Sequence, residues 1–190
     1  MTNAERIANY HRVTGFPESL FVGGDGRIVG TWIMGNDYRV KSGYYGGYPA
    51  GYLRRCRALF PDKERALHLF SGRVAKDTFP GYTIDINPAL QPDFVDNAEG
   101  ITCVPINDRD IVLSDPPYSA EDCEHYGTPM VNRNKVMQDL GAKLTSDCHV
   151  VWLDQVLPMY RKTEFAIDGV IGMVKSTNHR FRVVTIFRKL

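Results

Sequence analysis

Residues 110–119 read DIVLSDPPYS, a short apolar run that stops at an acid, two prolines and a tyrosine. Such a run is typical of a strand that is buried on both faces of a parallel sheet. Proline fixes φ and removes a backbone donor, so Asp115-Pro116-Pro117-Tyr118 predicts a rigid, extended corner where this strand ends. What the corner faces depends on how the other strands are arranged.

The composition predicts an ordinary globular protein. The chain has 190 residues, of which 43% are hydrophobic and 24% charged, enough for one domain with an appendage. Its formal net charge of +1 predicts no overall attraction to nucleic acid or to an anionic membrane, so any basic surface must be local. No apolar stretch reaches the roughly 18 residues of a membrane span, and the first residues lack the apolar core of a signal peptide. The cysteines are scattered without a CxxC pair, which predicts no metal site and favours a cytoplasmic protein.

Two parts of the chain differ in pattern. Residues 1–49 predict an N-terminal extension with a short helix, a hairpin over 20–33 around Gly-Gly-Asp-Gly, and a loop rich in Gly and Tyr. Residues 50–190 alternate between helical and strand patterns, which predicts an α/β domain with a mostly parallel sheet covered by helices on both faces. The expected helices span 3–12, 50–60 and 131–144. The expected strands span 65–70, 82–87, 93–96, 110–114 and 149–157, followed by an antiparallel closing pair at 165–176 and 181–189.

Ligands bind beyond the carboxyl ends of the strands in an open α/β sheet. The residues that follow the first strand are Phe70, Ser71 and Gly72, and a glycine there lets a ligand approach the backbone closely. Carboxylates follow four successive strands, and the fold is expected to bring them to one rim. If the ligand is an adenosine, Asp85 can accept both ribose hydroxyls and Asp96 can accept from the adenine amino group. The four acids are Asp85, Asp96, Asp115 and Asp154.

The proline corner suits an exocyclic amine. The Asp115 carboxylate and the Pro116 carbonyl can both accept from one NH2 group, which leaves the nitrogen lone pair free to point at an electrophile. Tyr118 can stack on the planar ring that bears the amine, an interaction worth roughly 1–3 kcal/mol. A base must be unpaired or flipped from a duplex to enter such a site.

These stretches resemble a known family. Asp115-Pro116-Pro117-Tyr118 is similar to the motif of the amino-group, adenine-specific DNA methyltransferases, within the class I S-adenosylmethionine-dependent superfamily. The segments YYGGYP (44–49), LHLFSG (67–72), DPPYS (115–119) and STNHRFR (176–182) resemble those of a compact group of bacterial and phage proteins. The resemblance implies a Rossmann-like fold with a mostly parallel seven-stranded sheet and an antiparallel edge. It also implies S-adenosylmethionine as cofactor and a nucleic acid substrate, most simply DNA methylated at adenine N6.

The resemblance also assigns residues. Catalysis is expected from Asp115, Pro116, Pro117 and Tyr118. Cofactor contacts are expected from Tyr45, Tyr48, Phe70, Ser71, Gly72, Asp85, Ile86, Asp96, Asn97 and Asp115, with the two tyrosines near the methionine end.

The sequence departs from the family in two places. Only Gly72 follows the first strand, whereas the family's cofactor loop has several glycines. No separate target-recognition domain fits into the residues after the corner. These departures leave open a methyltransferase that acts on RNA, and a module that binds S-adenosylmethionine without catalysis. A nicotinamide enzyme is disfavoured because no GxGxxG follows the first strand.

Overall fold

The computed structural model describes residues 1–35, 47–176 and 180–190. The strands within these residues are β1 (Leu20–Val22), β2 (Ile28–Met34), β3 (Ala66–Leu69), β4 (Gly81–Asp85), β5 (Phe94–Val95), β6 (Ile111–Ser114), β7 (His149–Asp154), β8 (Phe165–Lys175) and β9 (Phe181–Lys189). The helices are α1 (Asn3–Thr14), α2 (Tyr52–Leu59), α3 (Ala120–Tyr126) and α4 (Arg133–Lys143), with a 3-10 turn η1 (Pro88–Leu90). Every predicted helix and strand is present, with ends shifted by a few residues.

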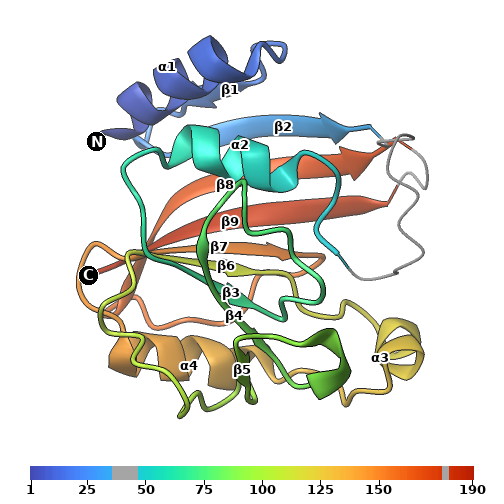
Figure 1. Cartoon of the computed structure of the whole chain (residues 1–190). Helices are drawn as coiled ribbons and strands as arrows, with labels where there is room; N and C mark the ends of the chain where they lie inside the picture. Colours follow the sequence, from blue (N-terminus) through green and yellow to red (C-terminus); the bar gives the residue numbers. More distant parts are fainter. Residues whose placement is uncertain (36–46, 177–179) are drawn as a thin grey trace.

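The nine strands of the described residues form one sheet in the order β1-β2-β8-β9-β7-β6-β3-β4-β5 (Figure 1). Strands β3, β4, β5, β6 and β7 pair in parallel, and in chain order they are arranged 3-2-1-4-5, the Rossmann-like arrangement. Strand β9 runs antiparallel between β7 and β8, so the predicted closing pair is confirmed. The predicted count of seven strands is wrong because the N-terminal hairpin adds two more.

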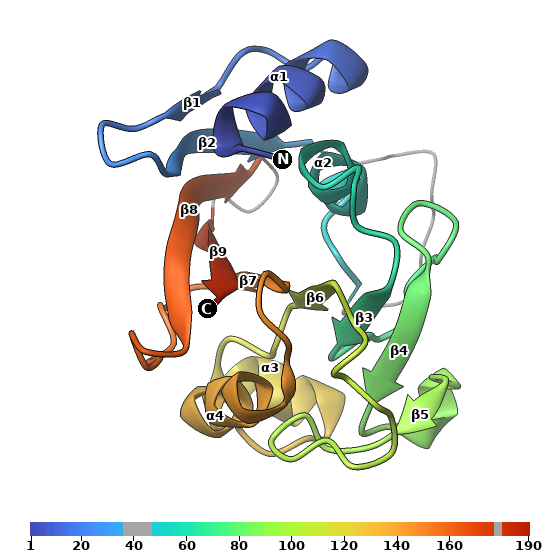
Figure 2. The same ribbon diagram turned by 90° about the vertical axis from the view of Figure 1, so that its left-hand side faces the viewer.

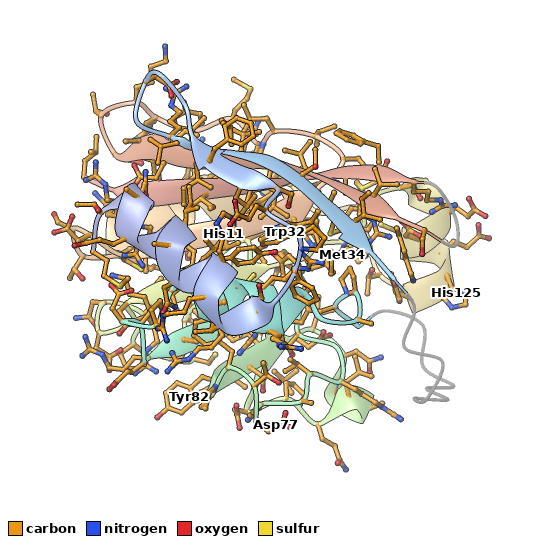
Figure 3. All side chains as sticks on the ribbon, turned by 90° about the horizontal axis from the view of Figure 1, so that it is seen from above. His11, Trp32, Met34, Asp77, Tyr82 and His125 are labelled. Carbon is orange, nitrogen blue, oxygen red and sulfur yellow. The ribbon has the colours of Figure 1, made fainter. Side chains whose placement is uncertain are left out.

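The N-terminal hairpin extends the main sheet. Strand β1 pairs antiparallel with β2, as the turn residues predict, and β2 pairs in parallel with β8 from Ile28 opposite Gly169 to Met34 opposite Lys175. Tyr10 of α1 stacks on Trp32 of β2, with ring centroids 6.0 Å apart. Figure 3 shows Trp32 and Met34 along β2, next to α1. Residues on both sides of the expected boundary between 49 and 50 therefore contribute strands to one sheet. That this boundary separates two domains stays a prediction.

Helices cover both faces of the sheet (Figure 2). On one face, α1 and α2 pack on alternate residues of the central strands, among them Leu113, Val151 and Val184. On the other face, α4 packs on the intervening residues, among them Val112 and Val150. Each central strand is thus apolar on both sides, which explains the uninterrupted apolar runs of the sequence.

Helix α3 lies outside the three helices that the sequence predicts. It buries only Asp122 and Cys123, so it has no apolar stripe for a periodicity argument to detect. Its ends are well defined: the Ser119 hydroxyl accepts from the Asp122 amide, and Gly127 ends the helix at φ 64°. Across the described parts of the chain, no helix has both the length and the apolar character that a bilayer crossing requires.

Candidate active site

A cavity of about 1780 Å³ opens at the carboxyl ends of the parallel strands. Ligand pockets commonly measure about 300–1,000 Å³, so this cavity is larger than a usual single-ligand pocket. The residues predicted for the site that line it are Tyr48, Phe70, Gly72, Asp85, Ile86, Asp96, Asn97, Asp115, Pro116, Pro117 and Tyr118. The predicted convergence of Asp85, Asp96 and Asp115 on one rim is therefore confirmed.

One of the predicted residues, Ser71, is placed differently. Ser71 is buried and is not among the lining residues, while its amide donates to the Ile84 carbonyl at 3.0 Å. Tyr45 lies outside the described residues. Tyr48 lines the cavity through its ring, which stacks on Tyr52, while its hydroxyl donates to the Leu113 carbonyl at 3.2 Å. Burial raises the pKa of the Tyr48 phenol well above its ordinary value, so this wall of the cavity is uncharged.

The loop after β3 turns with few glycines. Phe70 has φ 54° and Gly72 has φ 55°, so a non-glycine residue takes one of the two left-handed positions. Such a conformation costs roughly 1–2 kcal/mol in a residue with a side chain. The Gly72 amide donates to Asp85 Oδ2 at 2.9 Å, which ties the loop to the end of β4. This contact explains how the chain makes the turn that the family makes with several glycines.

Asp96 is an anion held by the backbone. Its carboxylate accepts from the amides of Asn97 at 2.8 Å, Thr102 at 2.7 Å and Cys103 at 3.0 Å. Burial opposes its ionisation, but these hydrogen bonds outweigh burial and lower the pKa of Asp96 to about 2. Asp85 is held in a similar way, because it also accepts from the Asn87 amide at 2.9 Å. Both acids are fixed acceptors on the β4–β5 side of the cavity.

The carboxyl of the corner after β6, Asp115, has a raised pKa, in contrast to Asp96. Burial raises the pKa of Asp115 to about 7, although the Tyr118 hydroxyl and Arg182 both act to lower it. The Tyr118 hydroxyl donates to Asp115 Oδ1, the one hydrogen bond to this carboxylate within the described part of the chain. The Arg182 guanidinium lies over the Tyr118 ring, 4.4 Å from its centroid. Asp115 is therefore a weakly solvated carboxyl in the lining of the cavity.

Asp154, the fourth predicted rim acid, does not line the cavity. Its side chain is fully buried and forms an ion pair with Arg133, with Nε 2.6 Å from Oδ2. The Trp152 indole and the Gln155 amide donate to the same carboxylate, at 3.1 and 2.7 Å. The expectation that all four acids meet at one rim is thus wrong for Asp154, because a long-range ion pair holds its carboxylate behind the corner.

Several residues outside the assigned catalytic and cofactor-binding set also line the cavity. Lys175 and Arg182, from the facing ends of β8 and β9, line the cavity, with Arg182 over the Tyr118 ring, and Asp85, Asp96 and Glu99 line its β4–β5 side. Arg54 and Arg73 also line it, as does His125, which is exposed on α3 at the periphery (Figure 3). The cavity lining therefore carries acids on its β4–β5 side, while its cations come from several elements, with Arg182 at the Tyr118 ring.

Comparison with known proteins supports the fold. No family model and no curated protein matches the chain. TrmN from Thermus thermophilus superposes with a TM-score of 0.55, at 16% identity, over 73% of this chain and 48% of that chain. The N-methyltransferase NodS from Bradyrhizobium japonicum WM9 gives a TM-score of 0.48, at 11% identity, over 72% of this chain and 92% of that chain. A TehB-like SAM-dependent methyltransferase from Corynebacterium glutamicum gives 0.46, at 12% identity, over 74% and 88%.

These likenesses are confined to architecture. The chain spans about half the length of TrmN, and at 16% identity the superposition shows the fold alone. Together with the strand order, it confirms the predicted Rossmann-like class I methyltransferase fold. The chemistry of the site has to be argued from the cavity itself.

Proposed function

We propose that this chain transfers a methyl group from S-adenosylmethionine to an exocyclic amino group, that of adenine in DNA at N6. One observation carries the proposal. The Asp115-Pro116-Pro117-Tyr118 corner lines the same cavity as Asp85 and Asp96, which supports the proposal that the corner receives the amine and the two acids bind the adenosine.

The acidic side of the cavity suits the cofactor. Asp85 ends β4, where an acid binds ribose hydroxyls in dinucleotide folds, and its carboxylate is already oriented by the Gly72 and Asn87 amides. Glu99 and Asp96 add negative charge beside it, which favours a cationic sulfonium ligand. Asn97 and Ile86 line the same side, where an adenine ring would lie. The residues present therefore fit S-adenosylmethionine.

The proline corner suits the acceptor. The target amine donates one N–H to Asp115 and the other to the Pro116 carbonyl, so positioning supplies most of the rate enhancement. S-adenosylmethionine, when bound, supplies the methyl group in a direct displacement that leaves S-adenosylhomocysteine and one proton. Asp115 can take that proton because its pKa of about 7 is close to the pH of the reaction. The Tyr118 hydroxyl contacts only Oδ1 of Asp115, so the second oxygen can accept from the amine, and the Tyr118 ring is expected to stack on the base.

The charge pattern favours a nucleic acid substrate. Arg182 lies over the Tyr118 ring and Lys175 lines the same cavity, so the phosphates of a base stacked on Tyr118 would meet at least one cation. The net charge of +1 leaves the rest of the surface nearly neutral, which fits contacts limited to a few nucleotides. The same contacts suit an unpaired adenine in RNA, so RNA is the second candidate.

Labelled methyl transfer tests the proposal. The protein is incubated with methyl-tritiated S-adenosylmethionine and, separately, with double-stranded DNA, single-stranded DNA, RNA or free adenosine, and the modified base is identified by mass spectrometry. We expect N6-methyladenine in DNA. Transfer to RNA alone would replace DNA with RNA as substrate. Cofactor binding by calorimetry without transfer to any acceptor would favour a non-catalytic module, and the lack of both would overturn the cofactor assignment.

A further inference from the structure

The peptide between Pro117 and Tyr118 is held at both of its polar atoms. Its carbonyl, on Pro117, accepts from Arg133 Nη2 at 3.1 Å. Its amide, on Tyr118, donates to Asp122 Oδ2 at 3.3 Å. A loop peptide beside a cavity is ordinarily free to exchange its hydrogen bonds with water, whereas this one has a charged partner on each side.

Arg133 is itself fixed. It is the first residue of α4, and its side chain makes a forked contact with Asp154, with Nε 2.6 Å from Oδ2 and Nη2 3.2 Å from Oδ1. The guanidinium is planar and rigid, so this fork sets the direction in which Nη2 points at the Pro117 carbonyl. Arg133 is not among the residues that line the cavity, and it acts on the corner from behind.

Asp154 holds Arg133 in place. Its carboxylate is fully buried and also accepts from the Trp152 indole and the Gln155 amide. A buried carboxylate is costly unless it is paired and hydrogen-bonded, and here both oxygens are satisfied at the end of a core strand. The ion pair with Asp154 therefore fixes Arg133 relative to β7, one of the central strands of the sheet.

Asp122 completes the arrangement from the other side. It is buried in the first turn of α3, and its own amide is capped by the Ser119 hydroxyl at 3.1 Å. The two prolines already fix φ at two successive positions of the corner. With the next peptide held on both sides, the Pro116 carbonyl and the Tyr118 ring have little freedom left.

We propose that Arg133, oriented by Asp154, and Asp122 are positioning residues for the reaction: they fix the Pro117–Tyr118 peptide, and through it the Pro116 carbonyl and the Tyr118 ring that receive the target base. This inference rests on the proposed function. A group that fixes the acceptor geometry affects the rate of methyl transfer and leaves the cofactor site intact, because Asp85 and Asp96 are on the other side of the cavity.

The first test is Arg133→Lys, which keeps the charge beside Asp154 and removes the fork. We expect single-turnover methyl transfer to fall about 10- to 100-fold, the usual effect of losing a group that orients a reacting one. The dissociation constant for S-adenosylmethionine should stay within about twofold of wild type, since none of its proposed contacts changes.

Arg188→Lys is the matched control. Arg188 makes a comparable ion pair with Asp168, Nε to Oδ2 3.0 Å, at the opposite end of the sheet, where it lies opposite His149. Its substitution should leave the transfer rate unchanged.

On the other side of the peptide, Asp122→Asn keeps an acceptor for the Tyr118 amide and should retain most of the activity that Asp122→Ala loses. The double variant Arg133→Gln/Asp154→Asn, a neutral pair, provides the same test if Arg133→Lys does not fold.

Amide hydrogen exchange supplies a readout that needs no activity. Exchange at the Tyr118 amide should become at least about tenfold faster in Arg133→Lys, while exchange at the Trp152 amide stays at its wild-type rate. A wild-type transfer rate in Arg133→Lys, or an equal fall in Arg188→Lys, would overturn the inference. If the wild-type protein transfers no methyl group, the proposed function is wrong, and exchange at Tyr118 still decides whether Arg133 fixes this peptide.

Discussion

Two carboxylates that follow consecutive parallel strands of the chain have opposite environments. Asp96, after β5, accepts hydrogen bonds from three backbone amides and has a pKa of about 2. Asp115, after β6, accepts from the Tyr118 hydroxyl, and burial raises its pKa to about 7. Both residues line one cavity, and both are Asp residues at the end of an apolar strand. Their electrostatic surroundings separate them by several pKa units.

The difference separates a binding role from a reacting one. An acid that accepts several backbone amides is a permanent anion, which acts on a ligand mainly through its charge. A carboxyl without such donors keeps its acceptor positions for a ligand and can exchange a proton near neutral pH. The cavity therefore places a fixed anion on the proposed cofactor side and a proton-exchanging carboxyl on the proposed acceptor side.

Removing the reacting carboxyl should have the largest effect. Asp115→Ala deletes one of the two acceptors for the target amine, so we expect methyl transfer to fall at least about 1,000-fold. The affinity for S-adenosylmethionine, measured by calorimetry, should change little. Asp115→Asn is the control, because its amide oxygen still accepts and it should retain more activity than Asp115→Ala. Normal transfer by Asp115→Ala would refute the assigned role.

The tyrosine at the corner should contribute less. Tyr118→Ala removes the stacking surface, and since stacking is worth roughly 1–3 kcal/mol, we expect a fall of about 10- to 100-fold in kcat/KM for the nucleic acid. Tyr118→Phe keeps the ring and removes the hydroxyl that donates to Asp115. Its kcat/KM at pH 8 should lie within about threefold of wild type. Equal losses in both variants would show that the hydroxyl, not the ring, is the functional part.

The two acids should have opposite effects on stability. The pKa of Asp96 lies below its ordinary value of 3.8, so its stabilisation is present above about pH 4 and is lost as the pH falls towards 2. The pKa of Asp115 lies above 3.8, so its contribution is present below about pH 4 and is lost as the pH rises through 7. Urea unfolding should show Asp96→Asn less stable than wild type at pH 6 by about 1–2 kcal/mol. Asp115→Asn should be more stable than wild type at pH 8 by about 2 kcal/mol. The same sign of change in both variants would contradict the contrast between them.

The smallest expected effect concerns substrate charge. Lys175→Gln removes one cation from the lining of the cavity, so binding of DNA should weaken a few-fold at 100 mM salt and the slope of log K against log salt should fall by about 1. Fluorescence anisotropy with a labelled duplex measures both quantities. Lys135→Gln is a suitable control, because Lys135 pairs with Glu99 at 3.8 Å and does not line the cavity. An unchanged slope in Lys175→Gln would place the phosphates elsewhere.

Much of the fold could be predicted from local patterns. Apolar runs gave the central strands, and Gly-Gly-Asp-Gly gave the turn between β1 and β2. The pairing of β2 with β8 could not be predicted in this way, because it joins residues more than a hundred positions apart and no local pattern encodes a partner. Helix α3 was missed for a different reason, since it buries two residues and has no apolar period. The Ser-x-x-Asp pattern at Ser119 and Asp122 was the available signal.

The site was predictable where the strand ends carry it. Asp85, Asp96 and the proline corner follow strands, so topology alone brings them together. Arg133 could not be predicted, because its role depends on a contact with Asp154 across 21 positions and on the direction of one guanidinium. The same contact removes Asp154 from the rim, where sequence reasoning had placed it. The end of a strand therefore predicts the backbone position of a residue, whereas long-range contacts decide the direction of its side chain.

The pH dependence of methyl transfer tests the central claim most directly. Single-turnover rates for wild type and Asp115→Asn are measured between pH 5.5 and 9 with saturating S-adenosylmethionine and DNA. The wild-type rate should rise with pH and level off above about 7, as Asp115 loses its proton, and the Asp115→Asn rate should be flat over the same range. The same rising profile in both proteins would show that another group titrates, and that Asp115 is not the acceptor on which the proposed reaction depends.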